Sequence, residues 1–422
     1  MYLVENHTLP TVSMQLVFAG GSADDPKGKE GLASVCMGLL SDGTEKLDKI
    51  AFSEALGDLA SSIGSYAGVD EQAVTLSSLT KNLDPTLDLF VDTLLRPGMR
   101  ADEFDRTIKK RLESLKQIKA SPQGIAGRVA GPIAYGDDHP YGRVWTEAST
   151  KALEVEDCRA YVKSWIQPAN AKLFVVGDVT RKDVEEKVGK RLASWKGKAK
   201  TPVAIPAPKP RKGKVFLVDV PGTPQALVRI MHGGPKRQDE DYVTNSLMVS
   251  ILGGGFSSRI NMNIREEKGW AYGAYGGFSY ARNFGLFSAG GSILVDKTAD
   301  SIQEILREIE RMKKEPVTEG ELARERDGAI LSLPASWATG AQVLSTYRSL
   351  VYYGLPLDWY SSYVPKVKAV TVGDVQAAAQ EHLKQDVQIL VVGDAEKVAP
   401  ELAKLGPILR LDADAKPTEQ AR

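Results

Sequence analysis

The 422-residue sequence is poor in the residues that build local metal sites and covalent cross-links. Its four histidines lie so far apart that no two form a local metal motif, and it has two cysteines, Cys36 and Cys158. Two cysteines exclude a small disulfide-dense scaffold. The apolar neighbours of Cys36 predict a buried, inert thiol. The cysteine content leaves the redox compartment open.

The chain also lacks an excess of either charge and any long apolar run. Lys and Arg number 54, and so do Asp and Glu, which gives a formal net charge of zero. This balance argues against a protein that coats nucleic acid or binds membranes through a polybasic surface. No run approaches the roughly 18 apolar residues of a membrane span. The hydrophobic fraction of 42% and the length predict a globular protein of two domains.

The first residues show no export signal. Met1–Val4 contain neither a charged segment nor a long apolar segment with a small-residue cleavage site. We expect either a cytoplasmic protein or a mature chain that has lost its signal. The strand-like residues that begin almost at once favour the second alternative.

A proline-rich and lysine-rich segment divides the chain almost in half. Residues 196–213 contain four prolines and six Lys or Arg residues, which predicts an extended, solvated linker. The predicted domains are therefore residues 1–195 and 214–422.

The two halves resemble each other. Val-Val-Gly-Asp closes a short apolar run at residues 175–178 and again at 391–394, 216 residues apart. Each run follows a helix-like stretch, so duplication is the better interpretation. Apolar residues alternate in the strand predicted near residues 12–18, and they fall at helical spacing in 299–314. Strands and helices interleave without a strict rhythm, which favours an α+β fold.

Residues 31–44 carry a resemblance to a known family. They read Gly-Leu-Ala-Ser-Val-Cys-Met-Gly-Leu-Leu-Ser-Asp-Gly-Thr. This frame resembles Gly-Leu-Ala-His-x-x-Glu-His-x-Leu-x-x-Gly-Thr of the pitrilysin/insulinase zinc metallopeptidases, which include mitochondrial processing peptidase. Further matches follow in the family's order along both halves: Gly20–Pro26, His139–Gly142, Pro168–Ala171, Gly254–Arg259 and Ile264–Tyr272. The resemblance implies two homologous domains, each a mainly antiparallel sheet covered by helices, which together form half of a clamshell.

The zinc motif itself is erased. In the family, two histidines at i and i+4 bind the metal and a glutamate activates its water. The corresponding residues here are Ser34, Met37 and Gly38, which cannot replace them. The third ligand of the family, a glutamate, corresponds to Gln117 or Leu115, with Glu113 nearby. We expect no metal in this chain.

The second-half motif is retained. Active members carry an arginine and, seven residues later, a tyrosine that reach the zinc site, and the matching residues are Arg265 and Tyr272. Both can donate hydrogen bonds to the oxyanion of peptide hydrolysis. If the segment were helical, this spacing would place both on one face. The alternative is that Arg265 pairs with an acidic neighbour and Tyr272 lies in the core.

An intact pair beside an erased motif implies the non-zinc subunit of a heterodimeric peptidase. This chain would bind unfolded peptide and supply Arg265 and Tyr272 to the partner, which would hold the zinc; alone it would not be catalytic. The rival is an inert scaffold or peptide-binding protein of the same fold. A hydrolase using another site has no motif in its support. By analogy with bacterial relatives we expect a periplasmic protein, with the cytoplasm as the alternative.

Overall fold

The computed structural model describes residues 1–418 and contains two sheets. The first sheet has the order β1-β5-β2-β4-β3 and is antiparallel except for the β1–β5 pair. In β2, Val12, Met14, Leu16 and Phe18 point into the core, as their alternation predicts. Its strands are β1 (Tyr2–Glu5), β2 (Thr11–Ala19), β3 (Ser62–Ala67), β4 (Glu71–Leu79) and β5 (Ala171–Gly177).

The second sheet repeats this order with one additional strand. Its order is β11-β6-β10-β7-β9-β8, so that β6, β10, β7, β9 and β8 correspond to β1, β5, β2, β4 and β3. The two Val-Val-Gly-Asp segments end the equivalent strands β5 and β10. The predicted α+β fold of two homologous halves is confirmed. The strands are β6 (Val215–Asp219), β7 (Gln225–Gly234), β8 (Ala271–Tyr280), β9 (Gly285–Leu294), β10 (Gln388–Gly393) and β11 (Ile408–Leu411).

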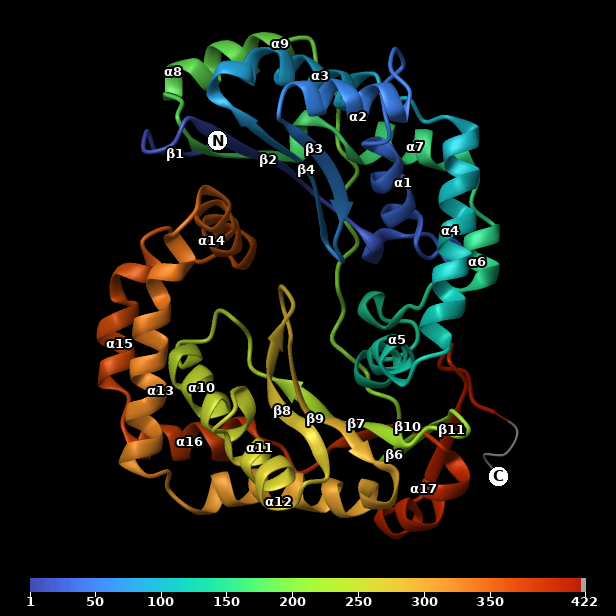
Figure 1. Cartoon of the computed structure of the whole chain (residues 1–422), viewed down its shortest axis with the longest axis vertical. Coiled ribbons are helices and arrows are strands. Elements are labelled where there is room, and N and C mark those ends of the chain that lie inside the picture. The colour runs from blue at the N-terminus through green and yellow to red at the C-terminus, as the bar shows by residue number, and fades with distance from the viewer. Residues whose placement is uncertain (419–422) are drawn as a thin grey trace. The chain divides into compact units, whose positions relative to one another are not determined.

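Helices surround both sheets (Figure 1). The N-terminal half contains α1 (Leu32–Leu40), α2 (Lys49–Asp58), α3 (Leu83–Leu95), α4 (Ala101–Lys119), α5 (Pro122–Tyr135), α6 (Glu147–Lys151), α7 (Val155–Trp165), α8 (Arg181–Val184) and α9 (Lys190–Leu192). The C-terminal half contains α10 (Tyr242–Val249), α11 (Arg259–Asn261), α12 (Thr298–Lys314), α13 (Glu319–Ser332), α14 (Gly340–Tyr353), α15 (Tyr363–Ala369), α16 (Val372–His382) and α17 (Ala395–Leu402).

Strand β10 is buried on both faces. Ile389 and Val391 belong to the main core of the second sheet. Leu390 and Val392 lie in a separate apolar cluster with residues of α5. Because both faces of this strand are covered, consecutive residues must all be apolar, which explains the sequence Ile-Leu-Val-Val.

Each of the two compact units of the structure contains segments from both halves of the sequence. One unit comprises residues 1–115, 145–205 and 335–349, and the other comprises 116–144, 206–334 and 350–422. Helix α5 thus packs with the second sheet, although it lies in the N-terminal half of the sequence. The predicted boundaries at 195 and 214 divide the chain by sequence order alone. Sequence order does not indicate that a segment such as α5 packs with the other half of the chain.

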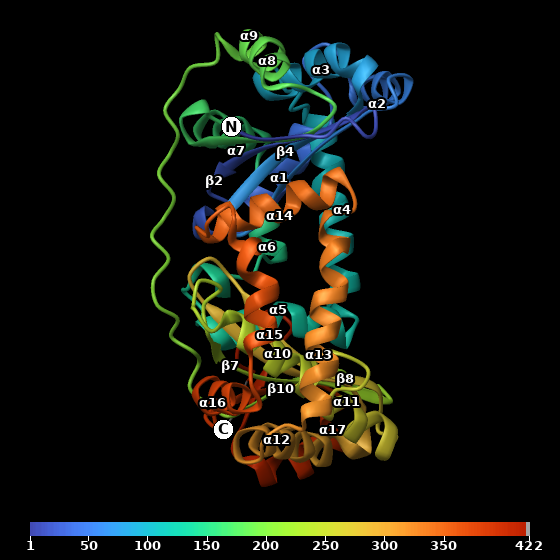
Figure 2. The ribbon, with the colours of Figure 1, turned by 90° about the vertical axis from the view of Figure 1, so that its left-hand side faces the viewer.

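The predicted linker forms no helix or strand across residues 196–213 and runs as an extended trace in Figure 2. It is nevertheless hydrogen-bonded near both ends. Lys200 N donates to Ser164 O at 3.0 Å, and Arg211 N donates to Ile133 O at 2.9 Å. These bonds attach one end to α7 and the other end to α5.

Cys36 and Cys158 form a disulfide, so the prediction of an inert thiol was wrong. The bond joins α1 to α7 across 122 residues of sequence, and both residues are fully buried. The apolar surroundings of Cys36 indicated its burial correctly. They could not indicate its partner, because the packing of α7 on α1 brings Cys158 there.

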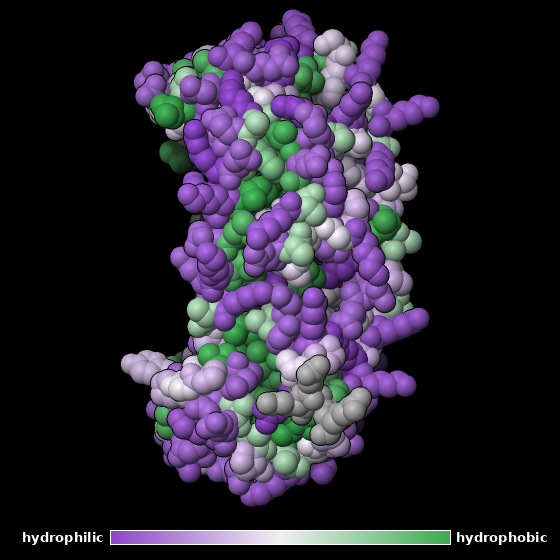
Figure 3. Space-filling view, turned by 90° about the vertical axis from the view of Figure 1, so that its right-hand side faces the viewer, coloured by the Kyte–Doolittle hydropathy of each residue, from purple (hydrophilic) through white to green (hydrophobic). Residues whose placement is uncertain are grey.

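Hydrophilic residues predominate on the side shown in Figure 3, where α4 lies. The buried residues of α4 are Glu103, Phe104 and Leu115, so this long helix turns most of its surface to solvent. Among the described residues, we find no helix with the length and apolar character needed to cross a bilayer.

Candidate functional site

Helix α1 carries the three positions of the erased zinc motif. Met37 is fully buried in the core of the first unit. Ser34 and Gly38 lie one turn apart on the exposed face of the helix. A methionine turned into the core offers no base to this surface, and glycine has no ligand atom.

A buried carboxylate holds the N-terminal end of α1. Asp25 is 3% exposed and accepts hydrogen bonds from Gly31 N at 2.7 Å and Ala33 N at 2.9 Å. These amides would otherwise have no partner at the start of the helix. Burial raises the pKa of Asp25 to about 6, although these hydrogen bonds and the charge of Arg111 act in the opposite direction.

Arg111 of α4 reaches the first position of the erased motif. Its Nη1 donates to Ser34 Oγ at 3.4 Å, a long contact between residues 77 apart in the sequence. Its Cζ lies 3.9 Å from the centre of the Trp145 ring. Gly31 makes room for the guanidinium, because a Cβ at this position would lie 2.3 Å from Nη2.

The third ligand position is also lost. Leu115 lies one turn after Arg111 on α4 and is 3% exposed, whereas Gln117 and Glu113 are exposed. Leu115 therefore shares the inward face of α4 with Arg111 and is the better equivalent of the two residues considered. The residues present do not fit a zinc ion: no His or carboxylate stands at the motif positions, and a guanidinium lies against one of them.

One group of His, Asp and Glu among residues 1–418 has ligand atoms close enough to hold a metal, and it lies elsewhere. Asp241, Glu381 and His382 belong to the second unit. His382 Nε2 lies 2.5 Å from Asp241 Oδ2, which is a hydrogen-bond contact between the start of α10 and the end of α16. Glu381 is largely exposed. The trio links two helices of the second unit.

Arg265 and Tyr272 lie together, but not on one helix face as the spacing suggested. Arg265 belongs to a π-helical segment, Met262–Glu267, and Tyr272 is the second residue of β8. The chain turns at Gly269, where φ is +66°, so the two residues meet across a helix-to-strand corner. Arg265 Cζ lies 5.8 Å from the centre of the Tyr272 ring.

Both side chains are accessible. Tyr272 is 90% exposed, which excludes the core position considered as an alternative. Arg265 is partly exposed, and its Nε forms an ion pair with Glu266 Oε1 at 3.1 Å, which is the acidic neighbour that the alternative expected for this residue. A phenol and a guanidinium offered together to solvent can donate hydrogen bonds to an anionic oxygen.

Sequence reasoning missed a third member of this surface, Phe256. It is 54% exposed, and Arg265 Cζ lies 4.7 Å from the centre of its ring. Phe256 lies within the Gly254–Arg259 segment that matched the family, so the resemblance pointed to the segment but not to this ring. Phe256, Arg265 and Tyr272 together form what we call the aromatic–arginine surface.

Asn261 holds the Phe256 loop against β8. It is fully buried, its Nδ2 donates to Phe256 O at 2.7 Å, and its Oδ1 accepts from Ala274 N at 3.2 Å. Both bonds bridge backbone groups of separate segments. Asn261 is thus one of the side chains that hold this loop, together with Ser258, whose Oγ donates to Gly255 O at 2.6 Å.

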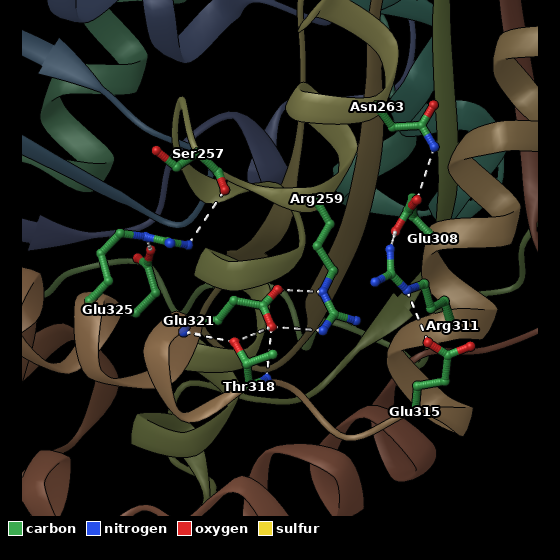
Figure 4. Close-up of polar contacts among 10 residues, drawn as sticks. Ser257, Arg259, Asn263, Glu308, Arg311, Glu315, Thr318, Glu321 and Glu325 are labelled. Carbon is green, nitrogen blue, oxygen red and sulfur yellow. Dashed lines mark hydrogen bonds and ion pairs between the residues drawn. The ribbon is translucent and has the colours of Figure 1, made fainter. Parts of the chain in front are cut away.

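Two further polar contacts fix the helices that carry this surface (Figure 4). Arg259 donates from Nε and Nη2 to the carboxylate of Glu321 at 2.7 and 3.0 Å. This hydrogen-bonded guanidinium lowers the pKa of Glu321 to about 2. Asn263 Nδ2 donates to Glu304 Oε2 at 3.1 Å and to Glu308 Oε1 at 2.9 Å, which ties the π-helical segment to α12.

Comparison with known proteins gives matches along most of the chain. The model of "Insulinase (Peptidase family M16)" matches residues 1–135, and the model of "Peptidase M16 inactive domain" matches residues 152–328. "Non-peptidase homolog YmxG" of Helicobacter pylori is 22% identical over 405 residues, which is 93% of this chain and 91% of that protein. "Zinc protease PqqE" of the same organism is 23% identical over 90% of this chain and 87% of its own length.

A solved structure agrees with these matches. The crystal structure of a peptidase M16 inactive domain from Pseudomonas fluorescens has a TM-score of 0.83 and 25% identity, and the likeness covers 93% of this chain and 94% of that chain. Matches to both parts of the family, in the order of the chain, confirm the resemblance seen in the motifs. The chain belongs to peptidase family M16, the insulinase family, as a member without the zinc ligands.

Proposed function

We propose that the protein is the non-zinc subunit of a heterodimeric M16 peptidase. It binds an extended peptide substrate and supplies Arg265 and Tyr272 to the active site of a partner that holds the zinc. The observation that carries this proposal is the exposed Tyr272 beside the partly exposed Arg265 in a chain whose own zinc motif is erased.

The exposure of the pair supports a role in contact with another molecule. A tyrosine ring that is 90% exposed contributes little to the core of its own unit. The neighbouring Phe256 is exposed as well, and both rings lie beside a cation. Aromatic and arginine side chains are the types enriched where proteins bind partners.

The relatives support the pairing of a zinc subunit with a subunit that lacks zinc ligands. Helicobacter pylori has both a relative named a non-peptidase homolog and a relative named a zinc protease. Both are similar to this chain over about nine-tenths of its length. An organism with one protein of each kind has the components of such a heterodimer.

The disulfide supports the periplasm as the compartment. Disulfides persist where the surroundings are oxidising, and the bacterial periplasm is such a compartment. The Cys36–Cys158 bond is buried, so it belongs to the folded core rather than to an exposed redox site.

An inert scaffold is the second candidate, favoured by the name of the non-peptidase homolog. The two candidates differ in one respect, the dependence of a partner's activity on Arg265 and Tyr272. The test is hydrolysis of a fluorogenic peptide by this chain together with the zinc-motif relative of its own organism, with and without chelator. We expect chelator-sensitive activity only in the mixture.

Variants then separate the candidates. Arg265→Ala and Tyr272→Phe should each lower kcat of the assembled complex by about 10²–10³-fold, the usual cost of losing an oxyanion donor. Tyr275→Phe is the matched control, because Tyr275 is also exposed and lies on the same strand. Full activity of both variants in a complex of normal stability would favour the scaffold.

A further inference from the structure

We infer that Arg111 is a fixed cation built into the erased zinc motif, and that it keeps divalent metals away from the exposed face of α1. The missing ligands at Ser34, Met37 and Gly38 are then only part of the difference between this chain and the zinc motif of the family. A positive charge also lies beside the first motif position, and restoring ligands alone would not restore a metal site.

The guanidinium lies close to the backbone of α1 at its first turn. Nη1 contacts Ser34 Oγ at 3.4 Å, and Nη2 occupies the space that a side chain at Gly31 would fill. Gly31 has φ +98°, a conformation suited to glycine. The sequence at the helix start thus accommodates the guanidinium.

Other groups hold the charge in this position. Trp145 lies under the guanidinium plane at 3.9 Å, a distance typical of cation–π stacking. Asp25, buried at the start of α1, interacts with the charge of Arg111, which opposes the rise in the Asp25 pKa. Arginine stays protonated at every pH at which proteins fold. The site therefore contains a permanent cation with a restricted orientation.

Charge, rather than lack of space, is what excludes a metal at this face. A Cβ added at Gly38 meets no atom within 4 Å, and Ser34 is exposed, so a larger side chain has space at Gly38 and can turn to solvent at Ser34. A divalent ion bound through position 34 would lie beside the guanidinium that contacts Ser34 Oγ. Like charges at such distances repel strongly in the partly buried surroundings of a protein surface.

The test restores two ligands and then varies the charge. The double variant Ser34→His/Gly38→His places histidines at i and i+4, the spacing of a zinc-binding pair on one helix face. This double variant is made in three backgrounds: the chain with its natural Arg111, the chain with Arg111→Gln, and the chain with Arg111→Lys. Binding of nickel chloride and of zinc chloride is measured by isothermal titration, and circular dichroism checks folding.

A matched pair elsewhere in the same unit provides the control. Ser53 and Gly57 of α2 are also a serine and a glycine four residues apart, both are exposed, and a Cβ at Gly57 meets no atom within 4 Å. The variant Ser53→His/Gly57→His is made in the same three backgrounds. Its affinity should not depend on residue 111.

We expect the Ser34/Gly38 pair to bind both metals about tenfold or more weakly with Arg111 or Arg111→Lys than with Arg111→Gln. Equal affinities in the three backgrounds would overturn the inference. If Arg111→Gln fails to fold, the two histidine pairs are compared in the Arg111 chain alone. Binding at positions 34 and 38 as tight as at 53 and 57 would then overturn it.

Discussion

Arg259 and Glu321 form a two-point ion pair that joins the start of α11 to the first turn of α13 (Figure 4). Glu321 also accepts hydrogen bonds from Thr318 N and Thr318 Oγ1, so that one carboxylate both caps α13 and holds the arginine. The Phe256 loop directly precedes Arg259. The ion pair therefore stabilises the base of the aromatic–arginine surface.

We expect Glu321→Gln to lower the free energy of unfolding by about 3 kcal/mol at pH 7, because it leaves Arg259 buried without its counter-charge. Since the folded-state pKa of Glu321 is about 2, below its ordinary 4.5, its contribution is present above pH 4.5 and is lost as the pH falls through about 2. Urea unfolding at several pH values measures both effects. Glu319→Gln, a change at an exposed residue of the same helix, should cost less than about 1 kcal/mol; an equal loss for both variants would contradict the role of the ion pair.

Asp25 should produce the opposite pH dependence. Its pKa is raised from 3.8 to about 6 in the folded chain, so its contribution to stability is greatest below about pH 3.8 and declines as the pH rises through 6. The difference in unfolding free energy between the native chain and Asp25→Asn should therefore fall by about 1–3 kcal/mol between pH 4 and pH 7. Asp48→Asn, at the N-cap of α2, serves as the control. A difference that does not change with pH would show that Asp25 ionises normally.

Reduction of the Cys36–Cys158 bond should destabilise the first unit. A bond that closes a loop of this length contributes about 2–5 kcal/mol, mainly by restricting the unfolded chain. Denaturant unfolding with and without dithiothreitol measures the loss. The double variant Cys36→Ala/Cys158→Ala should be less stable than the oxidised chain and insensitive to the reductant. Peptide mapping that found two free thiols in the protein purified without reductant would contradict the bond.

Asn261 should act on the aromatic–arginine surface without being part of it. Asn261→Ala removes both bridging hydrogen bonds and should cost about 1–3 kcal/mol, because Phe256 O and Ala274 N lose their buried partner. In the proposed complex with a zinc subunit it should raise KM for peptide more than it lowers kcat, since Arg265 and Tyr272 remain. Asn6→Ala, an exposed asparagine, should change stability by less than about 0.5 kcal/mol. Unchanged KM would rule out a positioning role.

Local patterns in the sequence predicted a large part of the molecule. The Val-Val-Gly-Asp segments indicated the duplicated strands, because apolar runs bounded by turn residues are signals within a few residues of chain. Motif spacing placed Ser34, Met37 and Gly38 on one helix, and it identified Arg265 and Tyr272 as a pair. The family followed from the order of these motifs.

Contacts between distant segments were decided only by the tertiary structure. Cys36 meets Cys158 across 122 residues, and Arg111 meets Ser34 across 77. The hydrophobic periodicities of strands and helices, 2 and 3.6 residues, do not predict such contacts, because these contacts depend on how whole helices pack. The sequence by itself determined which zinc ligands are missing. The tertiary structure decided that the guanidinium of Arg111 lies against the first of these positions, Ser34.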